Sequence, residues 1–388
     1  MIEIVVLALG MVTLLVWLAF GVDAALGRHL VLYLRRVPLP DEDTRASLPR
    51  LSVVFGARNE ARAVKAAVGT MLALDYPGLQ VVAVDDRSDD GTGEILDEFA
   101  RRDGRLRVLH IQQLPKGWLG KNHALWAGAR AASGEIILFT DADVMFESTV
   151  VLRAVAWMQQ NGVDHVAGAT DIHARGLALQ LFIATFALFF NGYFRPWRAA
   201  DPNSSVYIGF GGFNLVRRHA YERAGTHAAL AMDPLDDVNL GKILKQSGSR
   251  QVCAIPGSMA KVEWYGSLGA AIRGLEKNTM AGVNWSLGLL LGGMAAQLLF
   301  TAWPFFAAVA ANGPARWLNL AIVVVIVTIH AAMLSETSLP IWLPLLLPIG
   351  VLLVVWTSAR AAVLTYWRGG IEWRGTFYPL AELRRGDR

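Results

Sequence analysis

Residues 135–143 read EIILFTDAD, a short apolar run that ends in two carboxylates separated by a single residue. An apolar run of this length is typical of a strand that is buried on both faces. Residues 80–86 read QVVAVDD and repeat the arrangement, with Asp85 and Asp86 at the end of the run. Both segments therefore predict buried strands whose last residues are acidic.

Around these two runs, short apolar segments alternate with longer segments of helical periodicity. Strands are predicted at 51–56, 80–84, 106–111 and 135–140, and helices at 60–74, 91–102 and 120–132. Such alternation predicts an α/β domain built on a doubly wound, mostly parallel sheet. Ligands bind such sheets at the carboxyl ends of the strands, which is where both acidic pairs should lie.

The composition adds a membrane component. The chain has 388 residues, 54% of them hydrophobic, and a mean hydropathy of +0.38, which is high for a soluble protein. The apolar residues are concentrated in four tracts, at 2–22, 286–311, 317–334 and 339–364. Each tract approaches or exceeds the roughly 20 residues that cross a bilayer as a helix. The first tract lacks a basic leading region and a clear cleavage site, which favours an anchor over a signal peptide.

The predicted organisation places the α/β domain between membrane anchors. Its parts are an N-terminal transmembrane anchor at 1–22, a juxtamembrane linker at 23–50, a catalytic domain at 51–265, an amphipathic interface segment at 266–285, a transmembrane bundle of about three helices at 286–364 and a basic tail at 365–388. Within the catalytic domain, the apolar segment 177–194 is barely long enough to span and has soluble-type sequence on both sides. We therefore expect it to lie at the membrane interface.

Charge predicts the orientation of the domain. Arg28, Arg35 and Arg36 follow the first tract and no basic residue precedes it, which predicts a catalytic domain on the cytoplasmic side of the cytoplasmic membrane. Four crossings would then place the tail outside, whereas its arginines favour the inside. The tract at 339–364, which contains three prolines and Arg360, is the candidate for a segment that does not cross.

Other classes of protein are disfavoured. The net charge of +4 is spread along the chain without a stripe that would bind nucleic acid, and the basic residues near the spans suit an anionic membrane face. Cys253 is the single cysteine, which excludes an intramolecular disulfide and a zinc cluster of thiolates.

The acidic pairs suggest a nucleotide and a metal. If the backbone stays extended past the strand, the side chains of Asp141 and Asp143 leave one face, and their hard oxygens suit Mg²⁺ or Mn²⁺ bridging a diphosphate. Asp85 and Asp86 are placed to accept hydrogen bonds from a nucleobase or ribose. Of the acidic residues that follow them, Asp89 or Asp90 is expected to cap the next helix.

Six motifs occur in an order that resembles family 2 glycosyltransferases with a GT-A catalytic domain, over roughly residues 51–265. They are Gly56-Ala57-Arg58-Asn59-Glu60, Asp85-Asp86, Gly117-Trp118-Leu119-Gly120-Lys121-Asn122, Asp141-Ala142-Asp143, Gly211-Gly212-Phe213-Asn214 and Leu235-Asp236-Asp237-Val238-Asn239-Leu240-Gly241. The resemblance implies a metal-dependent enzyme that uses a nucleotide-sugar donor, with UDP as the expected nucleotide.

The same resemblance implies roles for individual residues. The nucleoside would be held by Arg58, Glu60, Asp85 and Asp86; Lys121 would lie near the diphosphate; Asp143 would be the principal metal ligand, beside Asp141. Asp237 would be the catalytic base, with Asp236 beside it. An inverting transfer needs a carboxylate that faces the acceptor hydroxyl, opposite the leaving diphosphate. Both residues also suit the first turn of a helix that runs to Gln246, where the helix dipole stabilises negative charge.

One departure from the family separates the candidate functions. Many relatives carry a Gln or Arg, two spacers and then Arg-Trp after the base, whereas this chain offers Arg273-Gly-Leu-Glu276-Lys277-Asn278. Lys277 is a candidate ligand of the diphosphate or a basic residue on an interface helix. The chain is most similar to single-transfer enzymes that act on membrane lipids, such as ceramide, hopanoid-associated and carotenoid-type glycosyltransferases. A polyprenyl-phosphate sugar synthase and a processive polysaccharide synthase are the alternatives.

Overall fold

The computed structural model describes residues 2–386, which form two compact units. The first, called here the sheet unit, comprises Leu30–Ile172, Pro196–Glu263 and Glu382–Arg388. The second, called the helical unit, comprises Met1–His29, His173–Arg195 and Trp264–Ala381. Each unit thus combines three segments that are far apart in the sequence.

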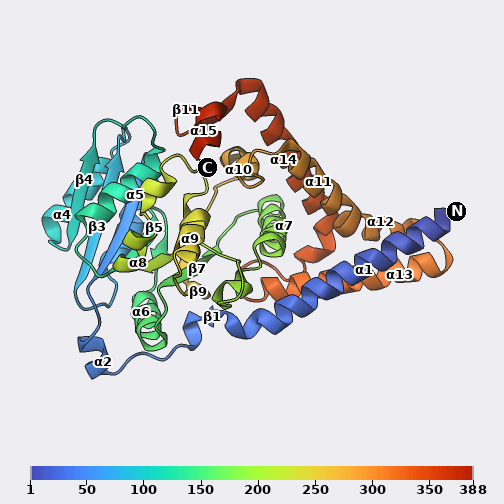
Figure 1. The fold of residues 1–388 in the computed structure, drawn as a ribbon, viewed down its shortest axis with the longest axis horizontal. Helices are drawn as coiled ribbons and strands as arrows, with labels where there is room; N and C mark the ends of the chain where they lie inside the picture. Colours follow the sequence, from blue (N-terminus) through green and yellow to red (C-terminus); the bar gives the residue numbers. More distant parts are fainter. Residues whose placement is uncertain (1, 387–388) are drawn as a thin grey trace. The chain divides into compact units, whose positions relative to one another are not determined.

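The sheet unit is built on a nine-stranded sheet (Figure 1). Its strands are β1 (Leu32–Tyr33), β2 (Leu51–Ala57), β3 (Leu79–Asp86), β4 (Leu106–Ile111), β5 (Ile136–Asp141), β6 (Met145–Phe146), β7 (His165–Ile172), β8 (Asn214–Arg217) and β9 (Gln251–Val262). The order is β1-β9-β7-β8-β5-β2-β3-β4, and β6 pairs with β9. β5, β2, β3 and β4 are mutually parallel, while β8 is antiparallel to both neighbours. The predicted mostly parallel sheet is confirmed.

The sheet unit also contains helices, most of which pack on the strands. They are α2 (Glu42–Ala46), α3 (Ala61–Leu72), α4 (Thr92–Arg102), α5 (Gly120–Ala131), α6 (Val150–Asn161), α8 (Arg218–Arg223) and α9 (Asp236–Gln246). α5 packs closely on the strands because Gly128 has no side chain: a Cβ there would lie 2.6 Å from Val54 Cγ1 and 3.0 Å from Val84 Cγ2. The close approach brings the first turn of α5 to the carboxyl edge of the sheet.

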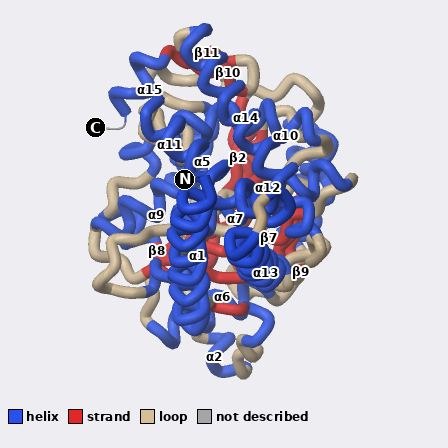
Figure 2. Tube along the Cα trace, turned by 90° about the vertical axis from the view of Figure 1, so that its right-hand side faces the viewer, coloured by secondary structure: helices blue, strands red, loops and turns tan. Residues whose placement is uncertain are grey.

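The helical unit holds the apolar tracts. It contains α1 (Ile2–Gly27), α7 (Leu177–Phe194), α10 (Leu268–Ala281), α11 (Leu287–Gln297), α12 (Trp303–Ala310), α13 (Gly313–Leu334), α14 (Leu347–Arg368) and the hairpin β10 (Gly370–Trp373) and β11 (Thr376–Pro379). Figure 2 shows α1 and α13 side by side. A π-helical turn at Leu298–Ala302 joins α11 to α12.

Among residues 2–386, five helical segments are long and apolar enough to cross a membrane. They are Glu3–Leu30, Leu177–Ala200, Leu287–Ala310, Gly313–Leu334 and Leu343–Arg368. One lies at the N-terminus and three lie in the C-terminal part, as predicted. The chain therefore has the composition of a membrane protein.

Several predicted boundaries differ from the structure. α1 continues to Gly27, five residues past the predicted end of the anchor at 22. The predicted linker at 23–50 contains β1, which pairs with Ala254 and Ile255 of β9 and so belongs to the sheet. Residues 173–195, predicted within the catalytic domain, group with the helical unit, and α14 extends to Arg368, beyond the predicted end of the bundle at 364. The pairing of β1 with β9 and the grouping of residues 173–195 depend on contacts between residues distant in the sequence, which local patterns do not encode.

Candidate active site

The carboxyl ends of β2, β3 and β5 lie side by side. Ala57 pairs with Asp85, and Gly56 pairs with Asp141, so the loop after β2 and both acidic pairs emerge at the same edge of the sheet. Parallel strands place their carboxyl ends together, which is why residues from three separate motifs meet here.

The loops after β2 and β3 are joined by hydrogen bonds. Asn59 adopts a left-handed conformation with φ 56°; its N–H donates to Ser88 Oγ at 3.0 Å, and its side-chain oxygen accepts from Asp89 N–H at 2.9 Å. Asp90 accepts from the N–H of Thr92 at 3.0 Å and from the N–H of Ala61 at 3.0 Å. Asp90 thus caps the start of two helices, which confirms the predicted capping role. Residues 58 and 60 flank the left-handed residue in this junction.

Asp85 and Asp86 are buried and each has a partner. Asp86 forms an ion pair with Arg87 at 2.8 Å. Asp85 Oδ2 lies 3.0 Å from His110 Nδ1, and His110 Nε2 lies 3.1 Å from Asp97 Oδ1. An imidazole with a carboxylate at each nitrogen donates from both only when it is protonated. The hydrogen bond that His110 donates to Asp85 is the main cause of the raised pKa of His110.

His110 was not among the predicted site residues. It stands on β4 directly opposite Asp85 in the strand register. A signal was available in the sequence, since His110 occupies the penultimate position of the strand that follows the acidic pair.

The Asp141-Ala142-Asp143 motif does not stay extended. β5 ends at Asp141, a turn follows at 142–143, and Val144 N–H lies 3.5 Å from the Asp141 carbonyl. The condition under which both side chains would leave one face of an extended strand is therefore not met. Ala142 takes the buried position in the turn, and both carboxylate residues stay partly exposed. The turn, rather than the two-residue period of a strand, presents the two acidic side chains.

Lys121, in the first turn of α5, lies among carboxylates from separate elements. Its Nζ is 2.9 Å from Asp141 Oδ1 and 3.3 Å from Asp236 Oδ2. Burial lowers the pKa of Lys121, but Asp141, Asp236 and Asp237 outweigh burial and raise it overall. Lys121 is therefore a charged ammonium that links the end of β5 to the start of α9.

The two neighbouring carboxylates at the start of α9 are in different environments. The side chain of Asp236 is 4% exposed and ion-paired with Lys121. Asp237 is partly exposed, and its Oδ1 accepts from Val238 N–H at 2.9 Å. Of the two, Asp237 is the carboxylate that a substrate can reach.

Gly211 lies where three of these groups converge. A Cβ on Gly211 would be 2.7 Å from Asp141 Oδ2, 3.3 Å from Asp237 Oδ2 and 3.3 Å from Lys121 Nζ. The absence of a side chain therefore leaves open the space between them. A pocket follows the same groups and is lined by Lys121, Leu125, Phe139, Thr140, Gly211, Asn214, His227, Asp236, Asp237 and Leu240.

Buried polar residues support the start of α9 from the sheet. Asn214 Nδ2 donates to the Asp237 carbonyl at 3.3 Å, and Asn214 Oδ1 is hydrogen-bonded to His165 Nε2. Burial lowers the pKa of His165 to about 4, so this imidazole is neutral. Asn214 belongs to a predicted motif but had no predicted role, and nothing in the sequence near His165 pointed to the site.

Lys277 is the one predicted site residue outside the sheet unit. It lies on α10 in the helical unit, with its Nζ 4.2 Å from the centroid of the Trp373 ring. This is the geometry of a cation–π contact.

The carboxylates fit a divalent ion that shares its ligands with a substrate. Among residues 2–386, no three His, Cys, Asp or Glu side chains gather closely enough to hold a metal by themselves. Asp141 and Asp143 supply hard oxygen ligands, and Mg²⁺ and Mn²⁺ commonly complete their shell with water and phosphate oxygens. The site therefore suits a metal that arrives with, or is completed by, a diphosphate.

Comparison with known proteins identifies the domain. Residues 52–225 match the model of glycosyl transferase family 2. The match covers somewhat less than half of the chain's 388 residues, so it shows the likeness of this segment to the family. The matched segment of this domain contains all the predicted site residues of the sheet unit except Asp236 and Asp237, which follow it.

Two curated relatives differ in what they make. The chain is 32% identical over 160 residues to the beta-monoglucosyldiacylglycerol synthase of Trichormus variabilis, covering 41% of this chain and 32% of that protein. It is 30% identical over 112 residues to the poly-beta-1,6-N-acetyl-D-glucosamine synthase of Staphylococcus epidermidis, covering 29% and 26%. The matches span only about a third of the length of the curated relatives.

A solved structure shares the fold of almost the whole chain. The mannosyltransferase PcManGT from Pyrobaculum calidifontis, in complex with GDP-Man and Mn²⁺, has a TM-score of 0.54 and 20% identity, and the match covers 95% of this chain and 99% of that one. Together with the family match, this likeness confirms the predicted GT-A fold.

Proposed function

We propose that the protein is a membrane-bound, inverting glycosyltransferase that transfers one sugar from a nucleotide-sugar donor, expected to be a UDP-sugar, to a hydroxyl of a membrane lipid. The observation that carries the proposal is the arrangement around Gly211. A partly exposed carboxylate, Asp237, faces the end of β5 across a space that also holds the ammonium of Lys121.

Asp237 is proposed as the base. Its carboxylate would take the proton of the acceptor hydroxyl while that oxygen attacks the anomeric carbon, opposite the leaving nucleoside diphosphate. Asp236 is buried and ion-paired with Lys121, so its role is to hold the lysine. Because Asp237 is in the first turn of α9 and Asn214 bonds to its carbonyl, the base is mounted on a rigid element.

The other end of the site is proposed to hold the donor. Asp85 and Asp86, with Arg58 and Glu60 in the adjoining loop, would contact the nucleoside. Asp143 and Asp141 would hold Mg²⁺ or Mn²⁺, which supplies positive charge to the departing diphosphate when bound. The related fold of a mannosyltransferase that binds GDP-Man and Mn²⁺ supports this division of the site.

A lipid acceptor is supported by two observations. One relative is named beta-monoglucosyldiacylglycerol synthase, and among the described residues five helices are long and apolar enough to cross a membrane. The arginines that follow α1 support a cytoplasmic sheet unit. A lipid whose tails stay in the bilayer avoids the free-energy cost of exposing hydrocarbon to water, which is about 0.8 kcal/mol per CH₂.

A processive polysaccharide synthase is the second candidate, favoured by the match to the poly-beta-1,6-N-acetyl-D-glucosamine synthase. In the first candidate, one sugar is added per lipid; in the second, products form a ladder. A polyprenyl-phosphate sugar synthase would instead place the sugar on a phosphate.

The test is mass spectrometry of products made by the purified full-length protein in nanodiscs containing a lipid extract, with a panel of nucleotide sugars. We expect a lipid carrying one added sugar, and slow transfer to a tail-free acceptor with the same head group. A ladder of sugars, a polyprenyl-phosphate product, or equal rates on the tail-free acceptor would contradict the proposal.

A further inference from the structure

α1 and α13 run side by side in the same direction. Near their starts, a Cβ on Gly10 would lie 2.8 Å from Leu318 Cδ2; at their ends, Arg28 forms an ion pair with Glu336 at 2.8 Å. The chain therefore leaves α13 at the membrane face where it leaves α1. Because the sheet unit begins at Leu30, this face is called here the sheet side.

α11 and α12 run in the opposite direction. α11 follows α10, which is connected to the sheet unit at Glu263, so α11 begins on the sheet side. α12 ends just before Gly313, where an added Cβ would lie 3.2 Å from Glu3 Oε1 near the start of α1. The π-helical turn between them packs in the middle, since Trp17 Nε1 donates to the Phe300 carbonyl at 2.7 Å.

Along the axes of α1 and α13, α14 begins near the midpoint of those two helices. Leu347 and Val351 are fully buried and pack in one apolar cluster with Trp17 and Ile326. At 1.5 Å per residue, Trp17 lies roughly 16 Å along α1 from Arg28. The chain thus returns from the sheet side to about mid-membrane between Glu336 and Leu347.

The connecting segment is irregular but covered. It contains Pro340, Pro344 and the 3₁₀ turn Leu343–Leu346, and the side chains of Leu339 and Leu343 are buried. Non-helical backbone is tolerated at membrane depth only where protein or water surrounds it.

α14 ends on the sheet side. Tyr366 Oη donates to the carbonyl of Trp285, just before α11, at 3.2 Å. Arg360 forms an ion pair with Glu276 of α10, and Arg368 lies 3.8 Å from the same carboxylate. Charged side chains avoid the hydrocarbon core, so this end belongs at the interface.

We propose that α14 is a re-entrant helix, and that three segments, α1, α11–α12 and α13, cross the bilayer. α7 also enters and leaves on the same side, because both of its ends continue into the sheet unit. Its 18 residues, about 27 Å of helix, are too few to cross the bilayer and return. α7 packs on α14, with Gly350 against Thr185. The two helices form a surface that contacts the lipids of a single leaflet, the one on the sheet side.

The test uses the single native cysteine. In a Cys253→Ala background, single cysteines replace exposed residues, namely Ser47 in the sheet unit, Asn312 between α12 and α13, Ser338 after α13, and Glu372 in the hairpin after α14. A membrane-impermeant maleimide is applied to sealed vesicles of each orientation, and Phe377→Cys serves as a second reporter of the hairpin.

We expect Ser47, Ser338 and Glu372 to be labelled from one face and Asn312 from the other. Labelling at 372 and 377 from the face that labels 312 would show that α14 crosses and would overturn the proposal. Labelling at 338 from that face would overturn it too. None of these outcomes depends on the identity of the donor or acceptor, so the result stands apart from the proposed activity.

Discussion

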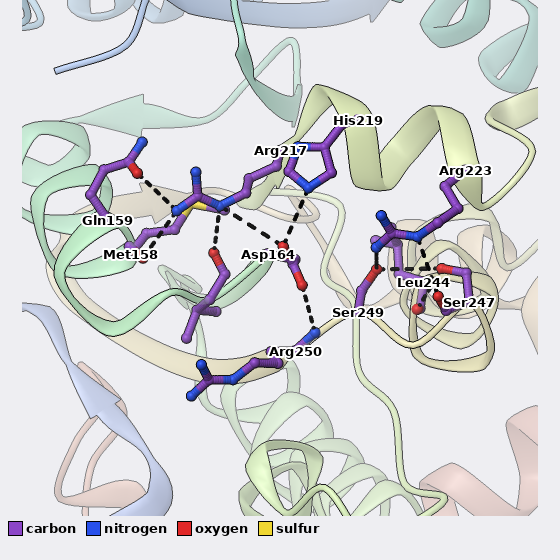
Figure 3. Close-up of polar contacts among 11 residues, drawn as sticks. Met158, Gln159, Asp164, Arg217, His219, Arg223, Leu244, Ser247, Ser249 and Arg250 are labelled. Carbon is purple, nitrogen blue, oxygen red and sulfur yellow. Dashed lines mark hydrogen bonds and ion pairs between the residues drawn. The ribbon is translucent and has the colours of Figure 1, made fainter.

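The charged clusters at the two ends of the sheet have opposite arrangements of charge. At the amino end of β7 and β9, a single carboxylate lies among donors: Asp164 Oδ2 accepts from Arg250 N–H at 2.9 Å, and Asp164 Oδ1 lies 3.9 Å from Arg217 Nε and 3.7 Å from His219 Nε2 (Figure 3). At the carboxyl end, a single ammonium, Lys121, lies among carboxylates.

The clusters also differ in what they are attached to. Arg217 donates to the carbonyl of Val163 at 3.0 Å and to Gln159 Oε1 at 2.8 Å, so the cluster in Figure 3 ties strand ends and a helix end together. The carboxylates around Lys121 instead stand on a turn and a helix start around an open space. The difference indicates that one cluster stabilises the sheet while the other is arranged for a ligand.

The largest effect is expected for Asp143→Asn. Activity should fall below detection and donor binding should lose its dependence on metal, because an amide is a poor ligand for Mg²⁺ or Mn²⁺. Isothermal titration of UDP with and without Mn²⁺ measures donor binding and its dependence on metal. Glu98→Gln, which removes an exposed ion pair with Arg102, is the control. Metal-dependent binding that survives in the variant would remove Asp143 from the metal site.

Asp237→Asn should lower turnover by a factor of about 10² to 10⁴, the range for loss of a general base, while donor affinity stays near that of the native protein. Initial rates and UDP titration on the same preparation separate the two quantities. If Asp236→Asn lowers turnover more than Asp237→Asn while leaving donor affinity unchanged, the base is one residue earlier.

Gly211→Ala should lower activity at least about tenfold, because the new methyl group would lie at 2.7 Å from Asp141 Oδ2, well inside contact distance. The backbone at 211 is not left-handed, so conformational strain does not explain a loss. Gly104→Ala is the matched control, since nothing lies within 4 Å of its Cβ position. Equal rates for Gly211→Ala and the native protein would mean that the space is not used.

Asp164→Ala should lower the stability of the protein rather than its activity. Loss of the acceptor for Arg250 N–H leaves a strand end without its partner and should destabilise the sheet by about 1–3 kcal/mol. Thermal unfolding in detergent measures the loss, and activity per folded molecule should be unchanged. Glu222→Ala, which removes an exposed ion pair with Arg218, should cost about 1 kcal/mol or less. A selective loss of activity in Asp164→Ala would break the contrast between the two ends.

The smallest effect is a pH dependence that His110 imposes through Asp85. Because the pKa of His110 is raised in the fold, the stabilisation from its carboxylate partners is complete below the ordinary value near 6.5 and is lost as pH rises through the raised value. UDP affinity of the native protein should therefore weaken by about tenfold or less between roughly pH 6 and pH 9.

The same titration with His110→Gln should give weaker binding with a flatter pH profile. Identical profiles for the two proteins would show that Asp85 does not depend on the protonated imidazole. Asp97→Asn tests the second carboxylate, whose exposed position predicts a smaller effect than the loss of His110.

Much of the sheet unit could be predicted because its signals are local. Apolar runs of strand length predicted β2 to β5 within two residues at each end, and the helix predicted to carry Asp236 and Asp237 in its first turn and to end at Gln246 is α9. The acidic pairs were found because they directly follow such runs. A parallel sheet then brings them to one edge whatever the remaining contacts are.

Tertiary structure alone decided the features that join distant residues. The pairing of β1 with β9, the partnership of Asp85 with His110, and the convergence on Gly211 each need a particular register or packing distance. The turn at Asp143 could not be read from the sequence, because an extended strand and a tight turn accommodate two acidic residues at this spacing equally well. Hydropathy likewise identified the tract that became α14, but hydropathy is symmetric along a helix and cannot tell a crossing from a return. That distinction rests on the hydrogen bond between Tyr366, near the end of α14, and Trp285, just before α11. The contact indicates that α14 ends on the side where α11 begins.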